Sequence, residues 1–168
     1  SMMNELLRSA IDALSIMHIN IRESNFAFSE GYNSFNFNSI NKQTQSFRKI
    51  KKIEAIELVS DDDSLKNELY YSFHYSVGLR FIAKSEETSK DENDVDTIFS
   101  IEAIFEAIYR SKRELSKEEL EEFAKQNVGF NVWPFWREYV QNSTSRMGIT
   151  TIAIPFFKFN KSDIPSLD

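Results

Sequence analysis

The spacing of apolar residues changes several times along this chain and divides it into short segments. Over Asn4–Leu14 apolar residues recur every three to four positions, which predicts a short amphipathic helix. Over Met17–Phe28 they alternate with polar residues, the period of a strand with one buried face. A second alternating run, Leu69–Ala83, is rich in Tyr, Phe and Val and predicts a long strand. Between the two strands, Glu30–Gln45 is interpreted as a connection that carries aromatic residues.

Two further segments are ambiguous between helix and strand. Phe47–Ser60 has isoleucines at helical spacing, but its Ile and Val content suits a strand as well. In Thr97–Arg110 the isoleucines and Phe105 share one helical face, so periodicity favours a helix. Alternate residues of this segment also share one strand face. The preceding segment Ser85–Asp96 has six acidic residues and one lysine, and we interpret it as a solvated loop that would also suit a hairpin tip.

Clearer helix signals stand in the last third of the chain. The serine and glutamate of Ser116–Glu119 form a capping box, which predicts a helix over Lys117–Gln126, ended by the asparagine and glycine that follow it. A proline near its start favours a second helix over Trp133–Met147, because the first helical position needs no N–H group. Gly148 is expected to stop that helix. Ile149–Phe159 is β-rich, but its proline excludes a central strand.

Composition limits the classes of site. The chain has 168 residues and a mass of 19.6 kDa, which suits one domain with its own core. It has no cysteine, two histidines and four glycines, so we expect no thiolate or histidine metal centre, no phosphate-binding glycine loop and no cofactor. It has no apolar run long enough to span a bilayer, and its first fifteen residues lack the apolar core of a signal peptide. We therefore expect a cytoplasmic location and no membrane insertion.

The sequence carries no recognisable catalytic constellation, so we expect a protein that is not an enzyme. His18 and His74 lie in strand patterns, where satisfied or solvated histidines are the ordinary interpretation. The basic stretch Arg48–Lys52 belongs to a chain of net charge −6 and is better explained as a solvated face than as a nucleic-acid site. The 15 Phe, 6 Tyr and 2 Trp residues either fill the core or line a surface that binds apolar groups.

Five short stretches together resemble the protein-export chaperone SecB. The most specific is Val132–Glu138, with its Trp-Pro-Phe-Trp-Arg-Glu run; the others are Ser145–Gly148, Ile152–Phe159, His18–Phe26 and the Ile-Phe pair that ends at Phe105. The resemblance implies one α+β domain over residues 1–168, a four-stranded antiparallel sheet with two helices packed on one face. The short helix 4–14 would precede it and a polar end, 160–168, would follow.

The resemblance also decides the ambiguous segments. Phe47–Ser60 and Thr97–Arg110 would both be strands, against the helical periodicity of the second. Members of the family form tetramers that are dimers of dimers, so a homo-oligomer is expected. The chain departs from the family at Ser100–Ala103, which replaces a glycine-rich stretch.

The function implied by the resemblance is an ATP-independent chaperone that binds unfolded polypeptides or preproteins for protein export. Two alternatives remain open: a dedicated SecB-like chaperone of a toxin–antitoxin system, and a non-catalytic oligomeric binding module. Glu23 stands where the family has an acidic residue that contacts the translocase motor SecA; a solvated carboxylate is the alternative. The expected client-binding residues are Phe35, Phe37, Phe105, Phe157 and Phe159. The alternative is that all five are core residues.

Overall fold

The computed structural model describes residues 2–84 and 95–149, followed by Ile152, Ile154, Pro155, Phe157 and Lys158; side chains are described from Glu5 onward. Most of the acidic segment and the polar end, residues 85–94 and 160–168, therefore lie outside the described residues. The elements follow in the order α1 (Met2–Ala13), β1 (Leu14–Phe28), α2 (Ser34–Phe37), β2 (Lys42–Leu58), β3 (Glu68–Ala83), β4 (Thr97–Ser111), α3 (Lys117–Phe123), the π-helical turn η2 (Ala124–Val128) and α4 (Gly129–Arg146).

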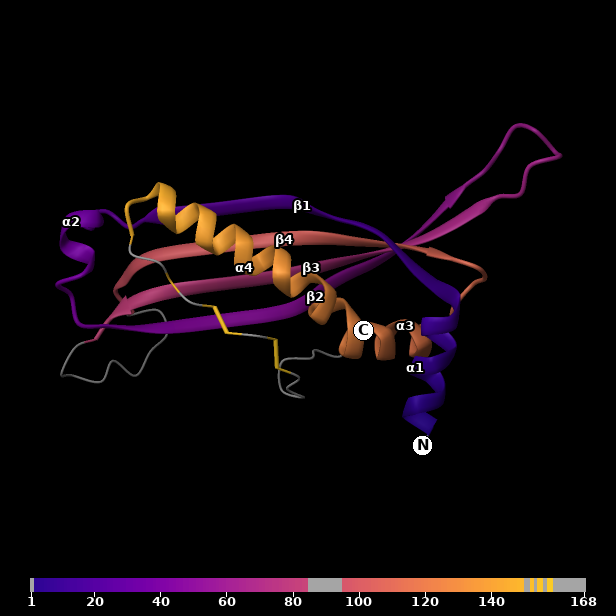
Figure 1. Cartoon of the computed structure of the whole chain (residues 1–168), viewed down its shortest axis with the longest axis horizontal. Helices are drawn as coiled ribbons and strands as arrows, with labels where there is room; N and C mark the ends of the chain where they lie inside the picture. Colours follow the sequence, from indigo (N-terminus) through magenta and orange to yellow (C-terminus); the bar gives the residue numbers. More distant parts are fainter. Residues whose placement is uncertain (1, 85–94, 150–151, 153, 156, 159–168) are drawn as a thin grey trace.

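The four strands form one antiparallel sheet in the order β1-β4-β3-β2, and α4 lies across one face of it (Figure 1). We call this face the helix face. The inner strands β3 and β4 direct alternate apolar residues toward it, and Phe73 of β3 packs edge-on against Tyr109 of β4 with ring centroids 5.4 Å apart. The predicted four-stranded α+β fold is confirmed.

Thr97–Arg110 is a strand, so the helical interpretation of its periodicity was wrong and the one from the family resemblance is confirmed. The reason is its place between β1 and β3, which pair with both of its edges. Ile101 and Phe105 are buried on the helix face, and Ile104 is buried on the opposite face. A strand with apolar residues on both faces loses its alternation and imitates a helical spacing.

The two predicted helices of the last third are one continuous helical segment, so the predicted break was wrong. Gly129 has helical dihedral angles, φ −59° and ψ −41°, and the π-helical turn joins α3 to α4 directly. Pro134 lies inside α4 instead of near its start. The predicted stop after α4 is confirmed, because Gly148 has φ +73°, the left-handed conformation that ends helices.

The connection between β1 and β2 is shorter than predicted, since β2 already begins at Lys42. It contains the one-turn helix α2, whose N-terminus is capped by the side chain of Asn33. This turn directs Phe37 into the core, where its ring packs against Phe28 and Phe81 with centroids 6.3 and 5.3 Å away. The aromatic connection is therefore part of the packed structure.

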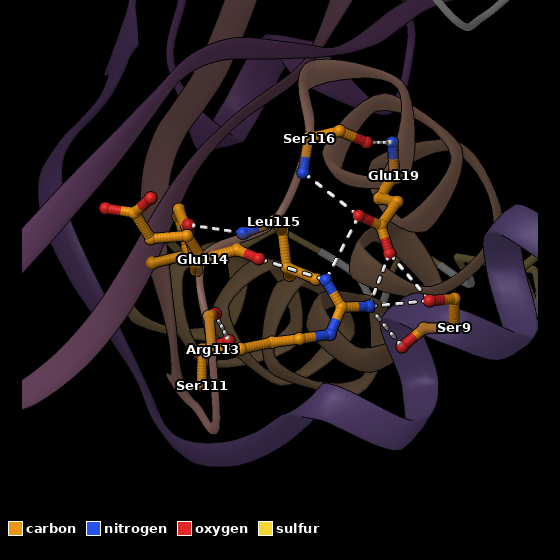
Figure 2. Close-up of polar contacts among 8 residues, drawn as sticks. Ser9, Ser111, Arg113, Glu114, Leu115, Ser116 and Glu119 are labelled. Atoms are coloured by element: carbon orange, nitrogen blue, oxygen red, sulfur yellow. Dashed lines mark hydrogen bonds and ion pairs between the residues drawn. The ribbon is translucent and has the colours of Figure 1, made fainter.

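A polar network ties α1 to α3, and Figure 2 shows it. Glu119 accepts hydrogen bonds from the Ser116 backbone N–H, from the Ser9 hydroxyl and from both terminal nitrogens of Arg113. The Ser116 hydroxyl accepts from the Glu119 backbone N–H in return, so the predicted capping box is present. One carboxylate thus caps α3 and anchors the N-terminal helix.

Candidate functional site

The helix face carries a groove between β2, β3 and α4, which we call the helix-face groove. Its volume is about 440 Å³. We call Ile152, Ile154, Pro155, Phe157 and Lys158, which follow α4, the tail residues; all of them except Phe157 line the groove. The groove is lined by Thr44, Ser46, Phe47, Arg48, Val77, Gly78, Leu79, Trp133, Trp136, Ile152, Ile154, Pro155 and Lys158.

Most of this lining is apolar, and its side chains differ in how deeply they are buried. Val77 and Leu79 of β3 are buried, as is Trp136 of α4. Trp133, one helical turn before Trp136, is half-buried. A rigid apolar floor with a partly accessible indole beside it suits binding of apolar side chains.

Side chains fasten the tail residues to this surface. The indole Nε1 of Trp133 donates a hydrogen bond to the Pro155 carbonyl at 2.7 Å. The Arg48 guanidinium donates to the Lys158 carbonyl and lies 4.2 Å from the centroid of the Phe157 ring, within cation–π range. The rings of Trp133 and Phe157 meet edge to face, with centroids 5.4 Å apart.

The structure separates the five phenylalanines predicted to bind clients. Phe157 is half-buried beside the groove, and Phe35 is 95% exposed on α2 but does not line it. Phe37 and Phe105 are 4% and 1% exposed, so in this conformation they are core residues with almost no surface for a client. Phe159 lies outside the described residues. The four described side chains therefore do not form one patch.

Sequence reasoning missed the residues that line the groove. Trp133 and Trp136 belong to the SecB-like motif, and their spacing of three, which places both on nearly the same side of a helix, is the signal that could have identified them. Val77 and Leu79 were recognised as one face of a strand, but nothing in their pattern says what covers that face. Arg48 was interpreted as one of several solvated basic residues.

Glu23 lies on the opposite face of the sheet, exposed on the edge strand β1 and paired with Ile104 of β4. It borders a shallow polar hollow of about 350 Å³ that Lys51 and Glu102 also line. The hollow holds carboxylates from the neighbouring strands β1 and β4 and one lysine from β2, so its charge is mixed.

The same face carries a row of charges around His74. Arg22 pairs with Glu106 at 2.5 Å, and Lys52 pairs with Glu54 at 2.6 Å. The hydrogen bond from Lys52 lowers the pKa of Glu54. His74 is 5% exposed, so it is not a solvated histidine, and its Nε2 lies 3.9 Å from Glu106 and 4.0 Å from Glu54 without a hydrogen bond among the described residues.

The described residues contain no cluster of three or more His, Asp or Glu side chains placed to hold a metal ion. No helix in them has the length and apolar character needed to cross a bilayer.

Comparisons with known proteins identify the fold. No protein-family model matches the chain, and no curated protein does. Among solved structures, the chain resembles the Mycobacterium tuberculosis SecB-like chaperone Rv1957, solved in complex with a ChAD peptide from the Rv1956 HigA1 antitoxin. The two share 15% identity with a TM-score of 0.63 over 92% of this chain and 97% of the other. A Streptococcus agalactiae protein of unknown function has 9% identity and a TM-score of 0.34 over 85% of this chain and 97% of that one. The chain thus has the fold of a SecB-like chaperone, as its sequence motifs indicated.

Proposed function

We propose that this protein is an ATP-independent chaperone that holds apolar segments of non-native polypeptides in the helix-face groove. The observation that carries the proposal is an apolar groove with two tryptophans on a SecB-like fold. Unfolded chains expose apolar side chains, and each one buried in such a groove contributes about 25 cal/mol per Å² of apolar surface removed from water. Binding of this kind uses burial alone and needs no nucleotide.

Two finer functions remain candidates. The resemblance to SecB favours a general holdase for protein export, with the motor SecA as a partner through Glu23. The antitoxin peptide bound to the structural neighbour favours a chaperone dedicated to one client, an antitoxin. Phe35, an exposed ring on α2, remains a proposed contact for clients, and Phe157, which lies beside the groove against Trp133, remains a proposed residue of the client site.

An aggregation assay tests the proposal and separates the two candidates. A general holdase is expected to suppress the aggregation of several unrelated, chemically unfolded proteins without ATP, whereas a dedicated chaperone suppresses only its own client. Trp133→Ala should weaken suppression several-fold, because it removes the accessible indole of the groove. Phe135→Ala is the matched control, since Phe135 is 47% exposed on α4 and does not line the groove.

Thermal melting by circular dichroism shows whether each variant is folded. Equal suppression by the wild type and a folded Trp133→Ala variant would place client binding outside the groove. If the wild type suppresses the aggregation of none of the clients, including antitoxins encoded beside it, the chaperone proposal fails.

A further inference from the structure

The ring of Phe157 lies on the helix face against Arg48, Gly129 and Trp133. We call the site formed by these three residues the aromatic socket. The guanidinium of Arg48 covers the ring at 4.2 Å, and the Trp133 ring borders it at 5.4 Å. Phe130 approaches from the same helix, with ring centroids 6.5 Å apart. The ring is therefore held by one cation and by aromatic edges, an arrangement suited to an aromatic side chain in particular.

Gly129 leaves room for the Phe157 ring in this position. A Cβ atom at this position would lie 2.8 and 2.9 Å from two carbon atoms of the Phe157 ring, closer than carbon atoms approach in folded proteins. The dihedral angles of Gly129 are ordinary helical values that alanine adopts readily. The glycine thus serves to leave room for a ring, at the cost of some helix stability.

The tail residues have the character of a client segment. They lie outside helix and strand, and they combine two isoleucines, a proline and an aromatic residue. Ile152 and Ile154 pack against the core and line the groove directly. The backbone of the tail residues is held at two points: Trp133 donates a hydrogen bond to the Pro155 carbonyl, and Arg48 donates one to the Lys158 carbonyl. Separating a segment that is held only by side chains costs less free energy than separating a strand that is paired in a sheet.

We propose that the tail residues are a tethered mimic of a client, and that the aromatic socket accepts a client's aromatic side chain once the ring of Phe157 leaves it. This inference rests on the proposed function and adds how the groove is regulated. A tethered segment competes at an effective concentration on the order of millimolar. Clients then need either high affinity or several contacts to displace it, which leaves the groove covered when no client is present.

The test uses the full-length chain and a fluorescent peptide of residues 149–158 of this sequence as the probe, with anisotropy as the readout. Phe157→Ala is expected to bind the peptide several-fold more tightly than the wild type, because the socket is vacant. A peptide with alanine in place of its Phe157 should lose this gain. Adding Gly129→Ala to the Phe157→Ala protein should abolish the gain as well, since the new methyl group fills the socket.

Phe135→Ala is the control and should bind the peptide as the wild type does. If Phe157→Ala binds the peptide equally or more weakly than the wild type, Phe157 is a fixed wall of the groove and the inference is overturned. The result is separable from the proposed function, because the aggregation assay on the wild type reports client capture whether or not the peptide distinguishes the variants.

Discussion

The carboxylate of Glu119 accepts four hydrogen bonds, which together cap α3 and link it to α1. Its hydrogen bonds from Arg113, the Ser116 backbone and Ser9 favour the ionised form and lower its pKa to about 2 from an ordinary 4.5, against the opposing effect of burial. A carboxyl whose folded pKa is depressed stabilises the fold at pH values above its unfolded pKa. This contribution, about 3 kcal/mol at most, is lost as the pH falls from about 4.5 toward 2.

We therefore expect Glu119→Gln to lower the free energy of unfolding at pH 7 by about 1–3 kcal/mol. Glutamine retains the reciprocal cap with Ser116 but loses the ion pair with Arg113. Urea unfolding at pH 7 and pH 3 measures the effect, and the difference between variant and wild type should shrink at the lower pH. Glu118→Gln, in the same first turn and exposed, is the control. A difference that does not change with pH would contradict the role of the charge.

At the scale of elements, β1 presents two unlike faces. Ile21 and Phe26 lie on the helix face, where Phe26 meets Tyr139 of α4 with centroids 6.3 Å apart. Glu23 and Asn25 lie on the opposite face, and two β-bulges in β1 keep this alternation in step with β4. The exposed carboxylate of Glu23 is thus available to a partner, whereas Phe26 packs against the helix.

If Glu23 contacts the translocase motor, Glu23→Lys should weaken binding of purified SecA several-fold at low salt and leave the oligomer unchanged. Glu57→Lys is the matched control, because Glu57 is an exposed strand acid on the other edge of the sheet. Calorimetric titration gives the affinities. SecA binding that is equal for both variants and the wild type would leave Glu23 as a solvated carboxylate.

At the scale of the whole molecule, apolar surface gathers along α1 and the edge strand β1. Exposed fractions are 45% for Ile11, 50% for Ile16 and Met17, 43% for Ile21 and 37% for Phe26. A long edge strand with apolar side chains tends to be covered by another chain in a soluble protein. We propose a homo-oligomer, with a tetramer as the expected state.

Light scattering at micromolar concentration should give a mass of several chains for the wild type. Ile16→Lys is expected to shift it toward the monomer, because a charge on the apolar edge strand opposes burial of that strand. Val59→Lys, at a 71% exposed valine beyond the end of β2, should leave the mass unchanged. A monomeric wild type would contradict the oligomer.

Local signals in the sequence determined those features whose causes lie within a few residues. The alternation in β1 and β3, the capping box at Ser116 and the left-handed stop at Gly148 all belong to this group. Because the SecB-like motifs are short and local as well, the fold could be anticipated from them. Of the four predicted phenylalanines that the structure describes, Phe157 is the one beside the groove.

Tertiary structure decided the features that depend on which segments pack against each other. Thr97–Arg110 is a strand because two neighbouring strands pair with it, which overrides its helical spacing. Phe37 and Phe105 are core residues because their rings meet neighbours from distant segments, whereas Phe35, two residues before Phe37, faces solvent. The groove joins β2, β3, α4 and the tail residues. Since β2 and β3 are far in the chain from α4 and the tail residues, only packing brings the two pairs together, and no local pattern records which side chains will meet.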